Sequence, residues 1–194
     1  FLKENKKNTK IISRDKNIPL KVAVIKGDDI FDKIQQMLNY GENFENLYNG
    51  KKFSDIKDRV CSANVYIDSF SIAEALELGA DIVLCGRVSD PGLVVGPCIY
   101  EFGWARNEFD KLASATVAGH IIECGAQCTG GNFSRWKDIK NLENIGFPIA
   151  SIFQSGMFEI SKPKGSGGLI NKYTISEQIL YELGNPQKYI SPDV

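Results

Sequence analysis

The chain has 194 residues, enough to bury the core of one domain. Its 23 basic and 24 acidic side chains nearly cancel, and this balance argues against binding to nucleic acid or to an anionic membrane surface. No apolar run approaches the roughly 20 residues that span a bilayer, and the polar start lacks the apolar centre of a signal peptide. We therefore expect a cytoplasmic protein whose five unclustered cysteines stay reduced.

A lead-in and a first strand–helix unit open the chain. Residues 1–19 are rich in Lys and Asn and show no hydrophobic period, so we expect a lead-in before a single α/β domain over residues 20–194. The β-branched run at 21–26 predicts a buried strand. Asp29 is placed to cap a helix that ends at Gly41, and the polar, Asn-rich stretch after this glycine predicts a loop.

The clearest unit is a helix followed directly by a strand. Ser71 and Glu74 form the S-x-x-E pattern of a capping box, and Gly79 is placed to end the helix. The continuous apolar run 80–85 then predicts a strand buried on both faces. A helix, a short turn and a buried strand make an αβ step, which is typical of α/β proteins.

Three further elements complete the expected fold. A helix over residues 108–124 ends before Gly125, two apolar runs at 147–153 and 157–160 predict a hairpin, and a last helix ends at Gly184. Together the elements predict a layered helix-sheet-helix α/β domain with a mostly parallel sheet and one hairpin. Because the first residue is not methionine, we expect a fragment of a larger α/β protein.

The first candidate site is CGRVSDPG, residues 85–92, at the carboxyl end of the clearest strand, where open α/β sheets bind ligands. Gly86 allows a sharp turn, and Arg87 offers a planar fork for a carboxylate or phosphate. Ser89 and Asp90 can hydrogen-bond a substrate or move a proton. The alternative is an Arg87–Asp90 ion pair that only closes the loop.

The second candidate site is KPKGSGG, residues 162–168, just before the last helix. Glycines there can present backbone N–H groups to an anion, and two lysines add positive charge. The spacing of a P-loop is absent, and a plain flexible connector is the alternative. The expected anion-binding residues are Lys162, Lys164, Gly165, Ser166, Gly167 and Gly168.

The third candidate is GHIIECGAQCTGG, residues 119–131, which contains the one histidine. His120, Cys124 and Cys128 are spaced as metal ligands could be, and His120 could activate a Cys124 thiolate. We favour the third alternative, in which His120 and Cys124 belong to a helix core beside Phe109, and we expect no metal. The glycine turn then forms a polar, substrate-binding lip made by Gln127, Thr129, Gly130 and Gly131.

Three long stretches carry a resemblance to a known family. They are SANVYIDSFSIAEALELGADIVLCGRVSDPGLVVGP, EFGWARNEFDKLASATVAGHIIECGAQCTGGNF, and GFPIA followed by KPKGSGGL and SEQILYELGNPQKYISPDV. In this order they closely resemble the acyclic terpene utilisation family, AtuA-like, over about residues 20–194.

The resemblance implies a pathway and a set of candidate residues. The family is associated with bacterial breakdown of citronellol and geraniol through branched acyl-CoA thioesters, and some relatives occur beside or fused to acyl-CoA carboxylase parts. Arg87, Asp90 and Glu123 match the family pattern and have side chains able to take part in catalysis. The other matching positions are Gly86, Gly125, Gln127, Thr129, Gly130, Gly131, Gly165, Gly167 and Gly168.

Two functional hypotheses remain. In the first, the protein is an enzyme that acts on a branched isoprenoid acyl or hydroxyacyl compound, with a CoA thioester as the candidate substrate. Asp90 or Glu123 moves a proton and Arg87 binds a carboxylate or polarises a carbonyl, as in a hydratase, isomerase or lyase. No dinucleotide fingerprint follows a strand, so we expect no redox cofactor.

In the second hypothesis, the protein is a non-catalytic accessory or scaffold component of an acyl-CoA carboxylase-type assembly. A homo-oligomer is compatible with both.

Overall fold

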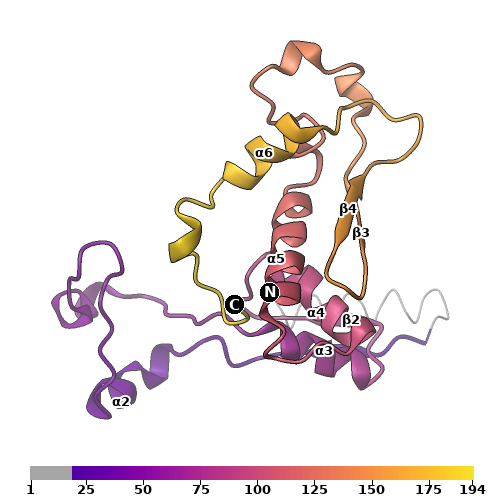
Figure 1. Ribbon diagram of the computed structural model, residues 1–194. Coiled ribbons are helices and arrows are strands. Elements are labelled where there is room, and N and C mark those ends of the chain that lie inside the picture. Colours follow the sequence, from indigo (N-terminus) through magenta and orange to yellow (C-terminus); the bar gives the residue numbers. More distant parts are fainter. Residues whose placement is uncertain (1–18) are drawn as a thin grey trace.

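The computed structural model describes residues 19–194 and shows a main body with a smaller lobe beside it (Figure 1). The predicted lead-in therefore lies, apart from residue 19, outside the described residues. The body holds the longer helices, α3 to α6, and two small sheets, so the mixed α/β class is confirmed. No helix in the described part of the chain is both long and apolar enough to cross a bilayer.

The parallel pairing expected of an α/β protein is present at the base of the body. Strand β1 (Val22–Val24) pairs in parallel with β2 (Ile82–Leu84), with Ala23 opposite Val83. These two strands make up the whole of this sheet among residues 19–194, and the antiparallel hairpin forms a separate sheet. The expectation that the second strand is buried on both faces is wrong, because its side chains are only half-buried.

Helix α3 (Ser69–Glu77) leads into β2, which confirms the αβ step, but its N-terminal signal is not the expected one. Asp68 is the N-cap, and its carboxylate accepts hydrogen bonds from the Ser71 backbone N (3.0 Å) and the Ser71 hydroxyl (2.8 Å). The predicted Ser71–Glu74 capping box is therefore wrong: Ser71 is the third residue inside the helix, where it is a donor to the cap. Gly79 ends the unit with φ +81°.

Helix α4 (Gly92–Phe102) has no counterpart among the predicted elements, because Gly92, Gly96 and Pro97 break the usual helix signals. Close packing on α3 explains the glycine: a Cβ on Gly96 would lie 2.7 Å from Cβ of Ile72. Tertiary contact thus overrides helix propensity here.

Helix α5 (Phe109–Glu123) forms as predicted but buries a different face. The core face carries Leu112, Ala115 and Ala118, which are completely buried, whereas Phe109 is 61% exposed. The prediction that Phe109, Ala113 and Val117 face a core is wrong, because all three are exposed. Together with Ala73, the two helices and Trp104 form the core cluster, whose members from α4 and α5 are Val95, Cys98, Ile99, Leu112 and Ala115.

The predicted hairpin is confirmed as β3 (Ile149–Ile152) and β4 (Phe158–Ser161), which pair antiparallel. Two hydrogen bonds tie its turn to the body. The indole N–H of Trp104 donates to Gln154 O (3.1 Å), and the Ser114 hydroxyl donates to Gly156 O (2.6 Å).

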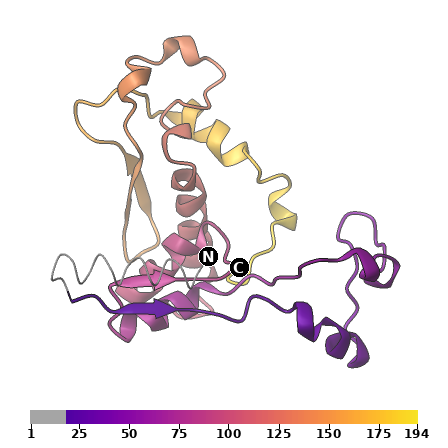
Figure 2. The ribbon, with the colours of Figure 1, turned by 180° about the vertical axis from the view of Figure 1, so that it is seen from behind.

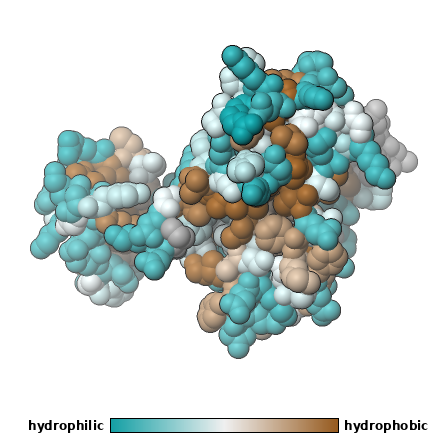
Figure 3. Space-filling view, turned by 45° about the horizontal axis from the view of Figure 1, so that its top comes forward, coloured by the Kyte–Doolittle hydropathy of each residue, from teal (hydrophilic) through white to brown (hydrophobic). Residues whose placement is uncertain are grey.

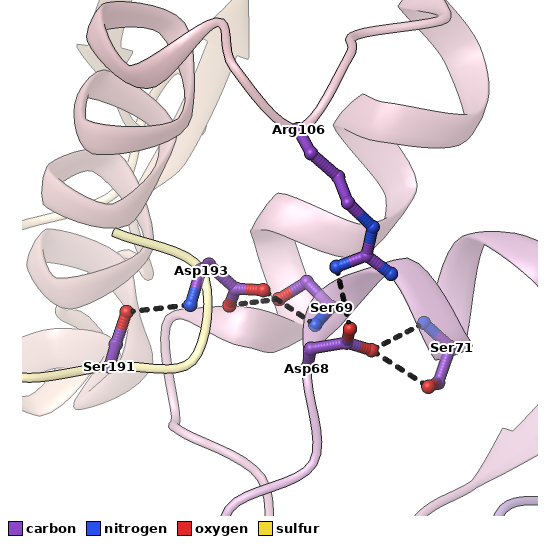
Figure 4. A network of polar contacts seen from close by, with 6 residues as sticks. All are labelled: Asp68, Ser69, Ser71, Arg106, Ser191 and Asp193. Atoms are coloured by element: carbon purple, nitrogen blue, oxygen red, sulfur yellow. Dashed lines mark hydrogen bonds and ion pairs between the residues drawn. The ribbon is translucent and has the colours of Figure 1, made fainter.

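The last helix, α6 (Lys172–Leu180), is shorter than the leucine spacing suggests. A capping box between Asn171 and Thr174 starts it, and Glu182 (φ +60°) and Gly184 (φ +58°) turn the chain away from it. The C-terminal segment 185–194, called the tail below, then returns to the body next to α3 (Figure 4).

The lobe is formed by residues 29–63 and stands apart from the body in both ribbon views (Figures 1 and 2). It contains α2 (Ile34–Asn39), and Asp29 starts it with a turn in which its carboxylate accepts from Phe31 N (3.0 Å), in place of the predicted helix cap. Single-turn helices complete the chain, at Phe31–Lys33, Phe53–Asp55, Lys57–Arg59, Gly125–Gln127, Trp136–Asp138, Leu142–Asn144 and Pro186–Lys188.

Candidate active site

A polar cavity of about 210 Å³ lies where the start of α4, the end of α5 and the tail meet. It contains two of the predicted catalytic residues, Asp90 and Glu123, and the predicted substrate-binding residue Ser89. It also contains Glu182, which the sequence did not single out. The full lining is Tyr66, Ser89, Asp90, Pro91, His120, Glu123, Glu182, Tyr189, Ile190 and Pro192.

His120 and Glu123 form a buried pair at the inner wall of this cavity. The His120 Nδ1 atom lies 3.1 Å from Glu123 Oε1, and the two side chains are only 7% and 13% exposed. The second nitrogen, Nε2, and the second oxygen, Oε2, are both buried and have no hydrogen-bond partner among residues 19–194. An unpaired buried polar atom is costly in free energy, so this pair is unusual for a contact with a purely structural role.

Burial and neighbouring charge favour the protonated form of Glu123. Burial raises the pKa of this carboxyl group first, the negative charge of Asp90 raises it further, and His120 opposes the shift. Tyr189 follows the same pattern: burial raises the pKa of its phenol, with Glu123 and Asp90 adding to the effect. The cavity thus favours a carboxylic acid and a phenol that can donate protons.

An apolar cavity of about 330 Å³ adjoins the polar one. This size falls at the lower end of the roughly 300–1,000 Å³ typical of small-molecule sites. His120 and Tyr189 line both cavities, so a ligand that crossed this wall would touch both. The other lining residues are Ala113, Thr116, Val117, Ile179, Leu183 and Val194.

Close helix packing brings the residues of the polar cavity together. A Cβ on Gly119 would lie 2.8 Å from Cα of Pro91, so α5 touches the start of α4 at the point between Asp90 and His120. Gln178 of α6 donates from Nε2 to the His120 carbonyl oxygen (3.2 Å). This carbonyl belongs to the last turn of α5, where helix carbonyls need partners from outside the helix.

The tail supplies the outer wall and is fixed by one aspartate (Figure 4). The Asp193 carboxylate accepts from the Ser69 backbone N and from the Ser69 hydroxyl, both at 2.7 Å. Ser191 accepts from the Asp193 backbone N at 3.2 Å, which fixes the turn of the tail. Both Ser69 and Asp193 are buried. This bidentate contact holds the tail, which carries Tyr189, against the polar cavity.

Arg87 lies in an adjacent region and does not join the His120–Glu123 pair. Its exposed side chain lines a cavity of about 410 Å³ that also includes Asp28, Gly86 and Asp90. No ion pair between Arg87 and Asp90 occurs in the described chain, so the alternative in which that pair closes the loop is wrong. Asp28 closes it instead, since its carboxylate accepts from the Arg87 backbone N (2.9 Å).

Two features of that turn explain its sequence. A Cβ on Gly86 would lie 1.9 Å from Oδ1 of Asp28, so any other residue would displace the carboxylate that accepts from the Arg87 backbone. The hydrogen bond from the Arg87 backbone is the largest cause that lowers the pKa of Asp28. Gly86 therefore has a clear geometric role, and its binding of substrate stays a prediction.

The predicted glycine lip serves the backbone and does not line any of the cavities described above. Thr129 is completely buried and its hydroxyl donates to Gly146 O (2.6 Å), while Gly131 N donates to Ala126 O (2.9 Å). Gly130 has φ +119°. The Gln127 side-chain oxygen is buried and has no partner in the described part of the chain. Substrate binding by these four residues stays a prediction that the geometry does not support.

The lysine-glycine loop does not present free amides as expected. Gly167 N donates to Asn144 O (2.8 Å) and Gly168 N donates to Lys140 O (3.0 Å). Ser166 N donates to Pro163 O (3.3 Å), and the Lys162 ammonium donates to Ser166 O (3.0 Å). The N–H groups of Ser166, Gly167 and Gly168 and the Lys162 ammonium are thus already hydrogen-bonded within the protein and are not free to bind an anion. Lys164 and Gly165 remain exposed. Anion binding there stays a prediction without geometric support.

The two alternatives for the cysteines gain no support. Burial raises the pKa of the Cys124 thiol, and it raises the pKa of Cys128 to about 11, so neither is a thiolate at neutral pH. Over residues 19–194, no group of three or more His, Cys, Asp or Glu side chains is placed to hold a metal. His120 is buried, as the core interpretation expects, and it also pairs with Glu123 at the wall of the polar cavity.

Some of the missed residues had a signal in the sequence and others had none. His120 and Glu123 are three apart on one helix, and this spacing puts them on one face. Tyr189 and Asp193 reach the site from a tail whose turn-rich sequence has no hydrophobic period that would show where it docks.

A family model described as "Acyclic terpene utilisation family protein AtuA" matches residues 3–194. No curated protein and no solved structure matches the chain.

Proposed function

Since the chain belongs to the acyclic terpene utilisation family, we propose that it acts by acid/base chemistry on a branched isoprenoid acyl or hydroxyacyl compound. One observation supports this proposal: His120, which pairs with Glu123 in the polar cavity, also lines the neighbouring apolar cavity. A branched hydrocarbon chain suits the apolar side, and the oxygen-bearing group then meets the pair.

The polar cavity contains the groups that hydration, dehydration or isomerisation needs. In a dehydration, an acid protonates the leaving hydroxyl, which departs as water, and a base takes a proton from the neighbouring carbon. Glu123 is the candidate acid, because its raised pKa favours the protonated form. Asp90, which is exposed, is the candidate base. Tyr189 is a second donor to the substrate oxygen.

A CoA thioester is the form of substrate we favour, and Arg87 is the candidate contact for its anionic part. Arg87 is exposed and lies on the cavity that shares Asp90 with the polar cavity. Its guanidinium matches phosphate or carboxylate oxygens in a bidentate way.

Deuterium exchange tests the acid/base proposal without knowledge of the natural substrate. The protein is mixed in D₂O with branched enoyl- and 3-hydroxyacyl-CoA thioesters, and NMR follows the carbons next to the carbonyl. We expect enzyme-dependent deuterium incorporation that Glu123→Gln lowers by about 10²-fold or more. Glu159→Gln, on exposed strand β4, is the matched control and keeps full exchange. Absence of exchange with every thioester would remove the proposal.

Contact with another protein is the second candidate, and the apolar surface of the hairpin region favours it. Phe147, Ile149, Phe153 and Met157 are all at least 46% exposed. Figure 3 shows apolar surface gathered across the body between hydrophilic margins. A surface of this kind is typical of interfaces, with a carboxylase-type partner or a second copy of this chain as candidates. Light scattering of Phe147→Ser/Met157→Ser against the unmodified protein tests self-association.

A further inference from the structure

The lobe ends in a hydrogen-bonded turn that holds two apolar side chains in solvent. This turn, called the tip below, is formed by residues 46–52, NLYNGKK. The Asn46 side-chain oxygen accepts from Tyr48 N (2.9 Å), and Asn46 N donates to Lys51 O (2.9 Å) across the turn. Leu47 is 84% exposed and Tyr48 is 99% exposed. Apolar side chains on a turn that is already ordered lose little conformational entropy on binding, so they suit the anchor of an interface.

The lobe holds this tip clear of the body. Figure 3 shows the lobe as a separate mass beside the body, and the ribbon in Figure 1 shows the same separation. Among residues 19–194, no hydrogen bond or ion pair joins the tip to the body. The apolar side chains of the tip therefore belong to no core of this copy, and they are available to a second molecule.

The charge of the tip restricts the surface that it fits. Lys51 and Lys52 are both exposed, and the tip contains no acidic residue. A complementary surface would combine apolar side chains with carboxylates and would carry no cation of its own, because like charges repel and opposite charges attract at short distance.

The mouth of the polar cavity has this composition. We define the mouth as the exposed part of the lining, which includes Ile190 at 72% and Tyr66 at 56% exposure. Asp90 and Glu182 are exposed there as well, and the cavity lining in the described chain contains no lysine or arginine. The full mouth is Tyr66, Asp90, Glu182, Ile190 and Pro192.

We propose that the tip of one copy docks on the mouth of a second copy of this chain. Leu47 and Tyr48 then contact the apolar part of the mouth, and the two lysines of the tip lie beside the carboxylates of Asp90 and Glu182. In a twofold dimer each copy gives one tip and receives one, so the contact closes. The partner copy thereby covers the polar cavity and supplies the cation that its lining lacks. The tip is accessible in the dilute monomer and covered in the dimer.

Sedimentation velocity over a series of protein concentrations tests the docking. We expect a concentration-dependent dimer that Leu47→Ser/Tyr48→Ser weakens by about tenfold or more. Tyr40→Ser is the matched control: Tyr40 is an 80% exposed tyrosine of the lobe outside the tip, so the dimer should persist. A monomer at every concentration, or a dimer that the double variant leaves intact, would overturn the inference.

A charge swap tests which surface receives the tip. Lys51→Glu/Lys52→Glu and Glu182→Lys should each weaken the dimer about tenfold, because each places like charges at both contacts. In an equal mixture of the two variants every contact again joins opposite charges, so dimers should return to within about threefold of the original affinity. Lys57→Glu, exposed in the lobe outside the tip, should not restore dimers when mixed with Glu182→Lys. No recovery in the first mixture would show that the mouth is not the receiving surface.

Photo-crosslinking locates the tip directly. Benzoylphenylalanine replaces Tyr48, and an equal mixture of unlabelled and ¹⁵N-labelled protein is irradiated and digested. We expect cross-links between labelled and unlabelled chains that map to residues 182–192. Cross-links within one chain would mean that the lobe folds onto its own body, and cross-links to the hairpin would mean a different interface; either result overturns the inference. The inference goes beyond the proposed function and does not depend on it, so the deuterium exchange experiment keeps its meaning in every case.

Discussion

Glu123 is the residue whose ionisation is most closely linked to the site. Folding raises its pKa above the usual 4.5, so the folded state favours the neutral acid. The contribution of this group to the free energy of unfolding is therefore fully present below about pH 4.5 and is lost as the pH rises through the raised pKa.

The carboxyl groups of Asp28 and Asp68 behave in the opposite way. The Arg87 backbone hydrogen bond lowers the pKa of Asp28; at Asp68 burial raises the pKa, but hydrogen bonds from Ser71 and Arg106 together outweigh it. Both contributions are therefore present above the usual 3.8 and are lost as the pH falls through the lowered values.

The variant Glu123→Gln separates these effects. Glutamine stays neutral at every pH, so the melting temperature of the unmodified protein should fall relative to the variant as the pH rises from about 5 to about 8. Differential scanning calorimetry across this range measures the difference. If the unmodified protein instead gains on the variant at high pH, Glu123 is stabilised as a carboxylate by a protonated His120, and the acid role assigned to it is wrong.

At the scale of elements, the contact between α5 and the start of α4 depends on Gly119. Helix propensity alone predicts that Gly119→Ala stabilises the protein by about 1 kcal/mol. Packing predicts the opposite, because the new Cβ would meet the Pro91 backbone, Cα at 2.8 Å and O at 2.9 Å, and backbone cannot rotate away. We expect a net loss of about 1–3 kcal/mol in urea unfolding.

An exposed position on the same helix is the control for Gly119→Ala. Ala113→Gly should cost about 0.5–1 kcal/mol, which is the ordinary price of glycine in a helix. If Gly119→Ala is neutral or stabilising, α5 and α4 are not in close contact, and the described cavity between Asp90 and His120 does not form.

The tail is the second element whose position matters to the site. Asp193→Ala removes both hydrogen bonds to Ser69 and leaves a buried donor unpaired, which typically costs about 1–3 kcal/mol. Most of this cost should appear locally, as faster amide hydrogen exchange over residues 185–194. The control Asp110→Ala changes an exposed carboxylate on α5. Unchanged exchange in the tail of the Asp193 variant would show that other contacts hold it.

The sequence predicted elements where local signals and packing agree. The αβ step at β2, helix α5 and the hairpin all formed as expected. It failed where distant contacts decide: Pro97 and two glycines hid helix α4, and the exposed face of α5 was taken for the buried one. The same holds for the candidate site. Asp90 and Glu123 stand in local motifs, so the sequence could predict them, whereas the position of Tyr189 is set by where the tail docks, which the sequence does not show.

At the scale of the whole molecule, the lobe is a part that few buried contacts hold in place. Its stem consists of hydrogen bonds from Ile30 N to Ala63 O (3.0 Å) and from Val65 N to Asp28 O (2.8 Å). Within the lobe only Ile34 is a buried hydrophobic residue. Segments with few buried contacts open locally at low cost in free energy.

Limited proteolysis measures this difference. We expect trypsin to cut first at the exposed Lys51, Lys52 or Lys57 of the lobe. The loop of the body at 132–144 is also exposed, but buried Phe133 and Ile139 anchor it, so it should be cut later. Mass spectrometry of the first fragments shows the order, and a first cut in 132–144 would contradict the picture of a weakly held lobe.

The pairing of β1 with β2 has a consequence for how the chain folds. The strands meet across 60 residues of sequence, whereas α3, α4 and α5 follow one another closely along the chain. Contacts between distant residues form late, because closing the loop costs entropy before the contact repays it. We therefore expect the helical core to assemble first and β1 to dock last. The closure cost grows only with the logarithm of loop length, by about 0.6 kcal/mol per doubling, so the lobe can tolerate long insertions without loss of the sheet.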